Sequence, residues 1–423
     1  MLQLLSIAFL VLVGHVGWWI FCYNRINATG LPRLWIKRVE LLIITLIVLL
    51  PMAFIFFHGE QLVALSRGQS DVELGSWMLA WIVWSIGCVV LLGPGWIESR
   101  FWLWPPANLI ALRTEWCDVA TEVDTPVTGQ WLTRRLSSLP LNEITQLSVT
   151  HKTLQLQRVF APEWDALTIG HLSDLHFTGG LTPDYYHFVI DRLKALSPDL
   201  IALTGDIVDT EECLEWIEPI LGHLSAPLGC FFVLGNHERR LKRPAMVAER
   251  LSALGWHDLG VSDAIVAPSH SQSIAGRRPG IVLTGNERPW FERHRDQPGQ
   301  SSLLTDPAHD RFVKIALSHS PDEYPWARDL GIDLMLAGHT HGGQVRLPVI
   351  GPLIAPSRYG SRFASGVFRL PPTLLHVSRG LSGTQPLRWR CPPEISQLTV
   401  IPQNADHSDP RTNVPASKAI VGG

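Results

Sequence analysis

The chain has 423 residues, of which 46% are hydrophobic and 17% are charged, and its formal net charge is −3. This length exceeds the usual span of one domain, so we expect more than one module. The slightly negative balance gives no indication of a basic surface, and no nucleic-acid partner is expected. The hydrophobic residues are concentrated before residue 105, which indicates a membrane region followed by a less apolar part.

Three apolar runs before residue 105 have the length of membrane-spanning helices: Leu2 to Tyr23, Val39 to Phe57 and Trp77 to Ile97. About 20 apolar residues cross a hydrocarbon core as a helix. We therefore predict an all-α membrane region over residues 1–104 with about three spans. Two or four spans are the alternatives, because Gly93, Pro94 and Gly95 interrupt the third run. No basic residue precedes the first run, which disfavours a cleaved signal peptide.

The charges between these runs predict the orientation of the region. Arg67 is the only basic residue between the second and third runs, whereas the loop between the first and second is rich in basic residues. Basic loops stay in the cytoplasm, so we expect a multi-pass protein of the inner or plasma membrane with a cytoplasmic catalytic domain. Residues 101–112 contain two prolines and are expected at the membrane interface. The basic residues of the first loop are Arg25, Arg33, Lys37 and Arg38.

Beyond the membrane region, short apolar runs alternate with amphipathic segments. Residues 144–159 alternate as half-buried strands do, and helix-like segments follow at 183–196, 210–224 and 244–254. Residues 373–402 are expected to form two strands with a loop between them. This alternation predicts an α/β layered fold, in which ligand sites lie beyond the carboxyl ends of the strands.

Five apolar runs between residues 167 and 341 each end in side chains that are common metal ligands. They are LTIGHLSDLH, LIALTGDIVD, CFFVLGNHE, VKIALSHSP and DLMLAGHTH. Two divalent cations about 3.5–4 Å apart need an anion between them and mixed oxygen and nitrogen ligands around them. Asp206 is the candidate for this bridge, because Gly205 allows an abrupt turn where the strand stops. The candidate side chains are Asp174, His176, Asp206, Asp209, Asn236, His237, His319, His339 and His341.

Each of these motifs has an ordinary explanation when it is taken alone. An aspartate after a strand is usually a helix cap, and a lone histidine is more often a surface or core residue. Asp209 in particular either caps the following helix or orients a metal ligand without binding the metal. Five such strand ends in one chain favour a metal centre over coincidence.

The motifs resemble those of the calcineurin-like metallophosphoesterases over about residues 165–400. HLSDLH, GHTHGGQ, PSRYGSRFASGVF and VSRGL are similar to the bacterial branch related to YkuE and YaeI, some of whose members are membrane-attached. The resemblance implies a four-layer αββα sandwich that holds two metal ions. It implies that one ion is surrounded by Asp174, His176, Asp206 and His341. It implies that the other is surrounded by Asp206, Asn236, His319 and His339, with His237 as the acid that protonates the leaving group.

These expectations divide the chain into four parts. The membrane region covers residues 1–104, and a connector with the first strands covers 105–164. The metallophosphoesterase domain covers 165–402, and a disordered tail covers 403–423, which is polar and without periodicity.

The expected reaction is hydrolysis of a phosphodiester or pyrophosphate rather than a monoester. Divalent ions supply a nucleophile at neutral pH, and a histidine supplies the proton that a poor leaving group needs. Asp206 and His237 are therefore the expected catalytic residues. Ligands of mixed nitrogen and oxygen suit Mn, Fe, Zn and Co, of which Mn is favoured.

Two stretches bear on the substrate. GGQVRLPVIGPLIAP (342–356) either packs onto the sandwich or forms an apolar lip that contacts lipid. NERPWFERHRDQPGQ (286–300) is either a solvated loop or a cap that grips an anionic headgroup. Membrane tethering favours a lipid-linked substrate, and the resemblance includes enzymes that cleave the pyrophosphate of UDP-diacylglucosamine. The alternatives are a general phosphoesterase on nucleotides or phosphoproteins and a non-catalytic membrane receptor; the oligomeric state stays open.

Overall fold

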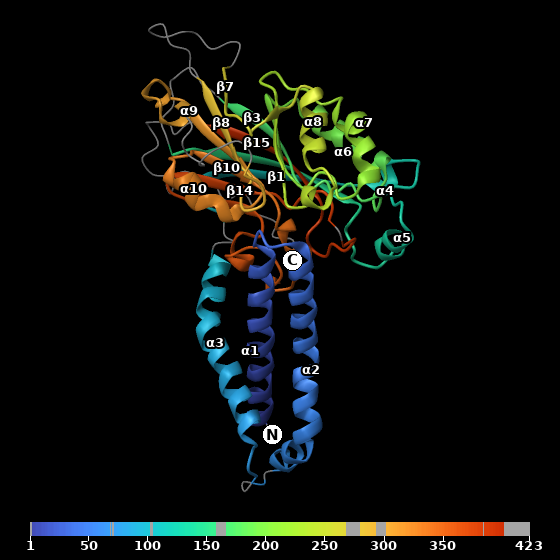
Figure 1. Cartoon of the computed structure of the whole chain (residues 1–423), viewed down its shortest axis with the longest axis vertical. Helices are drawn as coiled ribbons and strands as arrows, with labels where there is room; N and C mark the ends of the chain where they lie inside the picture. Colours follow the sequence, from blue (N-terminus) through green and yellow to red (C-terminus); the bar gives the residue numbers. More distant parts are fainter. Residues whose placement is uncertain are drawn as a thin grey trace.

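The computed structural model describes residues 2–67, 69, 72–101, 105–157, 166–267, 280–292, 302–383 and 385–401. Three long helices stand side by side beneath a body of sheets and shorter helices, which we define as the described residues from 105 onward (Figure 1). The expected tail, 403–423, lies outside the described residues.

The three long helices are α1 (Leu2–Asn27), α2 (Arg33–Ser66) and α3 (Ser76–Phe101). Each is long and apolar enough to cross a membrane, so the prediction of three apolar helices is confirmed. Pro94 lies inside α3 without ending it, and α2 departs from helical geometry at His58. Their outward side chains are apolar, with Phe56 and Trp77 each 82% exposed, as lipid contact requires.

The first sheet has seven strands, which in spatial order are β1 (Leu109–Asp118), β2 (Gln146–Gln155), β15 (Glu394–Ile401), β3 (Leu167–Leu172), β4 (Leu200–Thr204), β5 (Cys230–Val233) and β6 (His257–Asp258). Strands β3 to β6 run parallel. β15 joins them to β2, antiparallel to β3 and parallel to β2.

The second sheet has six strands, which in spatial order are β13 (Gly366–Leu370), β14 (Thr373–Val377), β10 (Leu334–Ala337), β9 (Val313–Ser318), β8 (Ile281–Asn286) and β7 (Ala264–Val266). Its four inner strands run parallel. A separate pair, β11 (Arg346–Leu347) and β12 (Gly351–Pro352), forms a small hairpin.

The two sheets pack face to face, and helices cover their outer faces. Successive residues of a strand point to opposite faces, so Leu200 and Ala202 of β4 join the core between the sheets, while Ile201 and Leu203 contact the helical layer. The expected four-layer αββα sandwich is confirmed. On the first sheet the helices are α6 (Pro183–Ala195), α7 (Ile217–Leu221) and α8 (Ala245–Ala253); on the second they are α9 (Ser302–Thr305) and α10 (Tyr324–Asp329).

Some predicted elements differ from the structure. Residues 109–112, expected at the membrane interface, belong to β1, which pairs with β2; Trp102 and Trp104 lie outside the described residues. The helix expected at 210–224 begins as a 3-10 helix, Glu211–Trp216, before α7. The strand β8 was not among the predicted runs. Two short helices, α4 (Val119–Glu122) and α5 (Trp131–Ser137), lie between β1 and β2.

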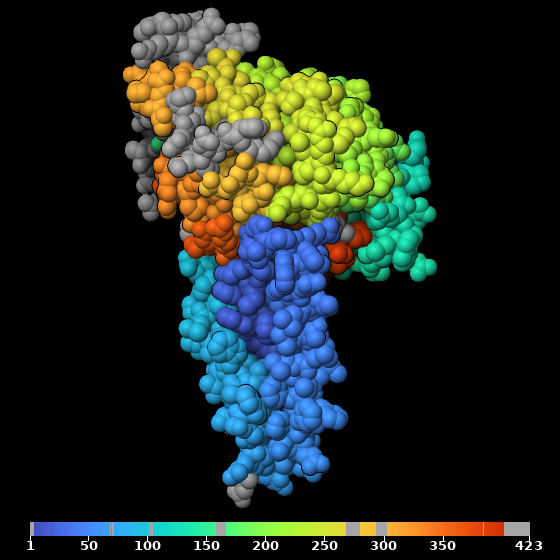
Figure 2. Space-filling view, viewed as in Figure 1, coloured from blue at the N-terminus to red at the C-terminus, as the bar shows by residue number. Residues whose placement is uncertain are grey.

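The ends of α1 and α3 and the α1–α2 linker all contact the body. Asn24, near the end of α1, donates to the Leu353 carbonyl (3.0 Å) and accepts from the Ala355 amide (2.9 Å). Arg100, at the end of α3, donates to Ser361 Oγ (2.8 Å). Arg239 of the body donates to the carbonyl of Gly30 in the α1–α2 linker (3.0 Å). The linker and the end of α3 therefore lie on the same side, against the body (Figure 2).

Candidate metal centre

Polar side chains meet where β3, β4, β5, β9 and β10 end. Their ligand atoms form three groups, within each of which all atoms lie within 4.8 Å of one another. The groups are Asp174–His176–Asp206–His341, Asp206–His319–His339 and His176–Asp209–His237. Every sequence-predicted site residue with a carboxylate or imidazole is present in them, and Asn236 joins the second through His319 (3.1 Å).

The backbone at these strand ends is sharply bent. Non-glycine residues rarely adopt positive φ, and such residues concentrate at functional sites. Gly205 (φ 81°) permits the turn after β4, where an added Cβ would lie 2.7 Å from the Gly235 nitrogen and 2.8 Å from His319 Nδ1. The other positive-φ positions are Asp174 (53°), His176 (46°), Asp206 (53°), His339 (70°) and His341 (50°).

The first group surrounds His176 Nε2. That atom lies 3.3 Å from His341 Nε2, 3.5 Å from Asp206 Oδ2 and 3.8 Å from Asp174 Oδ1. His176 Nδ1 contacts Asp209 Oδ1 (2.8 Å), and a carboxylate only accepts, so the ring proton sits on Nδ1. Nε2 therefore turns a lone pair towards another nitrogen and two carboxylate oxygens, a set that fits a divalent cation.

The second group surrounds His319 Nε2 in the same way. His319 Nδ1 donates to the Thr204 carbonyl (2.7 Å), while Nε2 faces Asn236 Oδ1 (3.1 Å), Asp206 Oδ2 (3.2 Å) and His339 Nδ1 (3.2 Å). Burial lowers the pKa of His319, but attraction to Asp206 outweighs it and raises the pKa to about 9. The surroundings of Nε2 thus attract positive charge, which a metal ion would supply in place of a proton.

Asp206 belongs to both groups. Its Oδ1 accepts from the His237 amide (2.8 Å), whereas its buried Oδ2 has no hydrogen-bond partner in the described part of the chain. Burial alone would raise the pKa of Asp206, but the imidazoles of His237 and His319 lower it well below its ordinary value. A buried, ionised oxygen without a hydrogen-bond donor fits a position between two cations.

Asp209 lies beside the centre and holds two imidazoles. Its carboxylate accepts from His176 Nδ1 (2.8 Å), His237 Nδ1 (2.8 Å) and Arg240 Nη1 (2.6 Å). The 3-10 helix that follows has no side-chain cap. Of the two alternatives for Asp209, the contacts therefore favour orientation of the imidazoles over helix capping.

His237 lies between Asp209 and an arginine that the sequence did not single out. Arg240 Nη2 contacts His237 Nε2 (2.6 Å), and because arginine only donates, Nε2 is the acceptor and the ring proton is on Nδ1. Burial lowers the pKa of His237 to about 4, although Asp206 and Asp209 oppose this. In this arrangement His237 is neutral.

Two further side chains support the centre and were missed as site residues. Buried Glu238 accepts from the amides of Ile207 (2.6 Å) and Gly235 (2.7 Å), and so joins the turns after β4 and β5. The ring of Trp290 lies 4.7 Å from that of His339, between centroids, and packs against His319 as well. Signals were available: Glu238 follows Asn-His directly, and Trp290 lies in the stretch 286–300 that the sequence offers as a cap.

The two substrate-related stretches take different forms. In residues 342–356, Val349 is 102% exposed and Ile350 and Ile354 are exposed too, as an apolar lip requires. In residues 286–300, Trp290 is buried against the centre and Arg288 pairs weakly with Glu292 (3.9 Å). Arg293 and Arg295 lie outside the described residues.

Comparisons with known proteins place these observations in context. A family model described as calcineurin-like phosphoesterase matches residues 167–343. YkuE of Bacillus subtilis, an uncharacterized metallophosphoesterase, is 32% identical over 243 residues, 56% of this chain and 80% of that protein. The phosphodiesterase YaeI of Escherichia coli is 27% identical over 54% of this chain and 80% of that protein. The UDP-2,3-diacylglucosamine pyrophosphatase LpxG of Chlamydia trachomatis is 30% identical over 59% of this chain and 88% of that protein.

Proposed function

The chain belongs to the calcineurin-like phosphoesterase family, and from this premise we propose a membrane-bound phosphoester hydrolase with two divalent metal ions, acting on a lipid headgroup. The bond cleaved is a phosphodiester or a pyrophosphate. Two relatives support this choice by name, since one is a phosphodiesterase and the other a pyrophosphatase for a diacylated sugar nucleotide.

The proposed ligands fall into two sets that share Asp206. One set is Asp174, His176, Asp206 and His341, and the other is Asp206, Asn236, His319 and His339. When bound, divalent ions supply a nucleophile at neutral pH and stabilise charge on the phosphoryl oxygens. Asp209 keeps the Nε2 lone pair of His176 directed at its set, because it accepts the Nδ1 proton (2.8 Å).

The proposed acid is His237, and the structure adds a condition to that role. Its Nε2 must carry a proton and face the leaving oxygen, whereas here it accepts from Arg240 Nη2 (2.6 Å). The Arg240 contact must therefore open before proton transfer. Asp209 Oδ2 accepts the Nδ1 proton of His237 (2.8 Å) and would stabilise the imidazolium form of the ring until it donates its proton.

One observation carries the proposal of a lipid substrate: the apolar lip of residues 342–356 is held by the membrane helices. This lip directly follows His341, and its backbone bonds to Asn24 of α1 at Leu353 and to Arg100 of α3 at Ile350 (2.5 Å). The exposed apolar tip is thus held close to the ends of α1 and α3. A headgroup at the bilayer surface would reach the centre without leaving the membrane.

The orientation is proposed from charge. Arg25 at the end of α1 and Arg33, Lys37 and Arg38 at the start of α2 flank the α1–α2 linker, which lies against the body, so we place the linker and the body in the cytoplasm. A reporter fused after Ile401 that is active only outside the cytoplasm would overturn this placement.

The reaction is tested with full-length protein in detergent. Metal-free protein is supplied with Mn²⁺, the favoured ion, or with Fe²⁺, Zn²⁺ or Co²⁺, and hydrolysis of bis-p-nitrophenyl phosphate is measured. Fully loaded protein without hydrolysis would favour a non-catalytic receptor. Lipid extracts from cells with and without the protein are then compared by mass spectrometry: accumulation of a phosphorylated lipid is expected, and changes confined to soluble nucleotides would favour the general phosphoesterase.

A further inference from the structure

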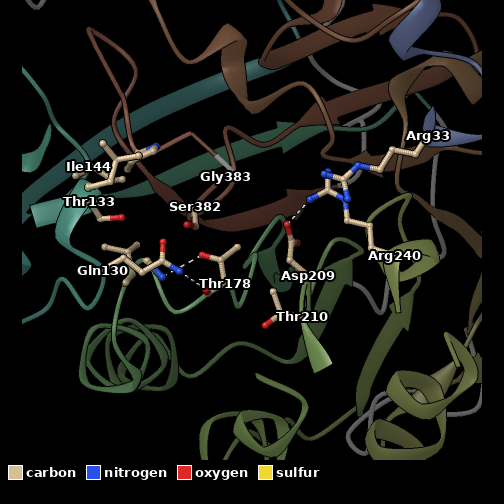
Figure 3. Close-up of a pocket in the computed structure, with 14 residues that line it drawn as sticks. Arg33, Gln130, Thr133, Ile144, Thr178, Asp209, Thr210, Arg240, Ser382 and Gly383 are labelled. Atoms are coloured by element: carbon tan, nitrogen blue, oxygen red, sulfur yellow. Dashed lines mark hydrogen bonds and ion pairs between the residues drawn. The ribbon is translucent and has the colours of Figure 1, made fainter. Parts of the chain in front are cut away.

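A cavity of about 270 Å³ lies beside the metal centre and is walled partly by a membrane helix. Arg33, the first residue of α2, lines it together with Asp209 and Arg240 of the body (Figure 3). Polar side chains, including Gln130 and Ser382, and apolar ones, including Leu132 and Ile144, line the rest of it. The cavity is therefore polar at its arginine end, adjacent to the proposed acid, and lined there by a residue of α2.

Two arginines meet at one end of this cavity. Arg33 and Arg240 are close enough to repel one another, and Figure 3 shows their guanidinium groups meeting above Asp209. Of the two arginines, only Arg240 donates to the carboxylate of Asp209 in the described part of the chain, and that carboxylate also accepts from His176 and His237. Two guanidinium groups beside one cavity are stabilised by an anion, and guanidinium binds phosphate through two parallel hydrogen bonds.

The position of Arg33 is set by contacts of the α1–α2 linker. The Gly30 carbonyl accepts from Arg239 (3.0 Å), the residue next to Arg240. Gly30 also lies against Pro289, where an added Cβ would be 2.7 Å from the Pro289 oxygen. Pro289 precedes Trp290, which packs on the metal centre. The linker is thus held by Arg239, next to Arg240, and by Pro289, next to Trp290.

We propose that Arg33 and Arg240 form a subsite for a second, non-reacting phosphate of the substrate. The inference rests on the proposed function and narrows it to diphosphate diesters. Arg240 contacts His237, the proposed proton donor to the leaving group. A phosphate bound by Arg240 would therefore be part of the leaving group. The polar wall with Gln130, Thr178 and Ser382 would then receive the group attached to that phosphate.

The test compares substrates with one and with two phosphates. Full-length wild type, Arg33→Ala, Arg33→Lys and Arg38→Ala are assayed on bis-p-nitrophenyl phosphate, on CDP-diacylglycerol in mixed micelles and on soluble UDP-glucose. Arg38 is the matched control, because it is an exposed arginine near the start of the same helix and does not line the cavity. Retention of the native thermal transition shows that each variant is folded.

Arg33→Ala is expected to raise KM for the diphosphate diesters about tenfold, the effect of losing one charged hydrogen-bond pair. Its kcat/KM on bis-p-nitrophenyl phosphate should stay within about twofold, with Arg33→Lys intermediate. Equal shifts on all substrates, or the same shift in Arg38→Ala, would overturn the subsite. A rise in KM for CDP-diacylglycerol alone identifies a lipid as the source of the diphosphate. A rise in KM for both CDP-diacylglycerol and UDP-glucose shows that the subsite also accepts soluble nucleotides.

Binding separates this inference from the proposed function. Asp206→Asn is used to measure the Kd of CDP-diacylglycerol without turnover, with and without Arg33→Ala. If the wild type hydrolyses nothing while binding weakens about tenfold on loss of Arg33, the subsite stands and the proposed reaction fails. If the wild type hydrolyses diphosphates and Arg33 changes neither Kd nor KM, the reaction stands and the subsite fails.

Discussion

The metal centre and the arginine cavity lie next to each other but are built in different ways. The centre comes from five strand ends of the body, its side chains are buried except for the partly exposed Asn236 and His341, and each motif is a few residues long. The cavity is lined by Arg33 of α2 and Arg240 of the body, and Arg33 is exposed. On our proposals, the reaction chemistry is contained in local motifs, while substrate choice depends on contacts between distant parts of the chain.

This difference leads to separable expectations. Changes at the centre should reduce turnover of every phosphoester by the same factor. Changes at the cavity or at the membrane boundary should alter the preference among substrates and leave the simplest substrate unaffected.

The largest effect is expected for Asp206→Asn. An amide would place one uncharged oxygen where Asp206 faces both ligand groups, so the metal content should fall below two ions per chain. We expect turnover to fall about a thousandfold or more, equally for bis-p-nitrophenyl phosphate and CDP-diacylglycerol. Metal analysis and kcat on both substrates check this, and a loss confined to one substrate would contradict it.

Asp209→Asn should have the next largest effect. The carboxylate accepts from two imidazoles and Arg240, whereas the amide nitrogen of Asn would oppose one of these donors. We expect metal affinity or kcat to fall about 10- to 100-fold, the usual range for a residue that orients ligands. Metal titrations and kcat are compared with those of Asp124→Asn, an exposed control; unchanged values would leave Asp209 without an orienting role.

The contrast between local and distant contacts also explains what the sequence predicts. The three apolar helices and the alternation of strands and helices follow from residue patterns, because burial and lipid contact both select apolar side chains. The candidate ligands are recognisable because each one ends an apolar run. Strand β1 was misjudged because it carries exposed apolar side chains, among them Ile110, Leu112 and Trp116, and so lacks the alternation of a half-buried strand.

Other features depend on contacts that no local pattern specifies. Arg240 gains a role only because the turn after β4 places Asp209 against it (2.6 Å). The docking of the α1–α2 linker depends on Gly30 meeting Arg239 and Pro289, which lie far away in the chain. Such contacts follow from the assembled fold, so the cavity was not predictable.

Gly30→Ala sharpens the comparison at this docking point. The added Cβ would lie 2.7 Å from the Pro289 oxygen, so the linker must move and carry Arg33 with it. We expect KM for CDP-diacylglycerol to rise about fivefold through misplacement, with bis-p-nitrophenyl phosphate unaffected. Gly17→Ala is the control, because its added Cβ would meet no atom within 4 Å. Equal KM values for the two variants would show that linker docking does not position the subsite.

The smallest effect is expected at the tip of the apolar lip. Val349 is fully exposed and has φ 64°, a conformation that is unfavourable for a β-branched residue and tolerated by asparagine. Val349→Asn should therefore keep or raise the thermal stability. If the tip contacts the bilayer, the same change should lower activity on CDP-diacylglycerol in vesicles about threefold, since it replaces an apolar side chain that the bilayer would partly bury. Activity on bis-p-nitrophenyl phosphate serves as the internal control. A stabilised variant with undiminished activity on vesicles would remove the lip from substrate access and leave the arginine cavity as the remaining link between membrane and site.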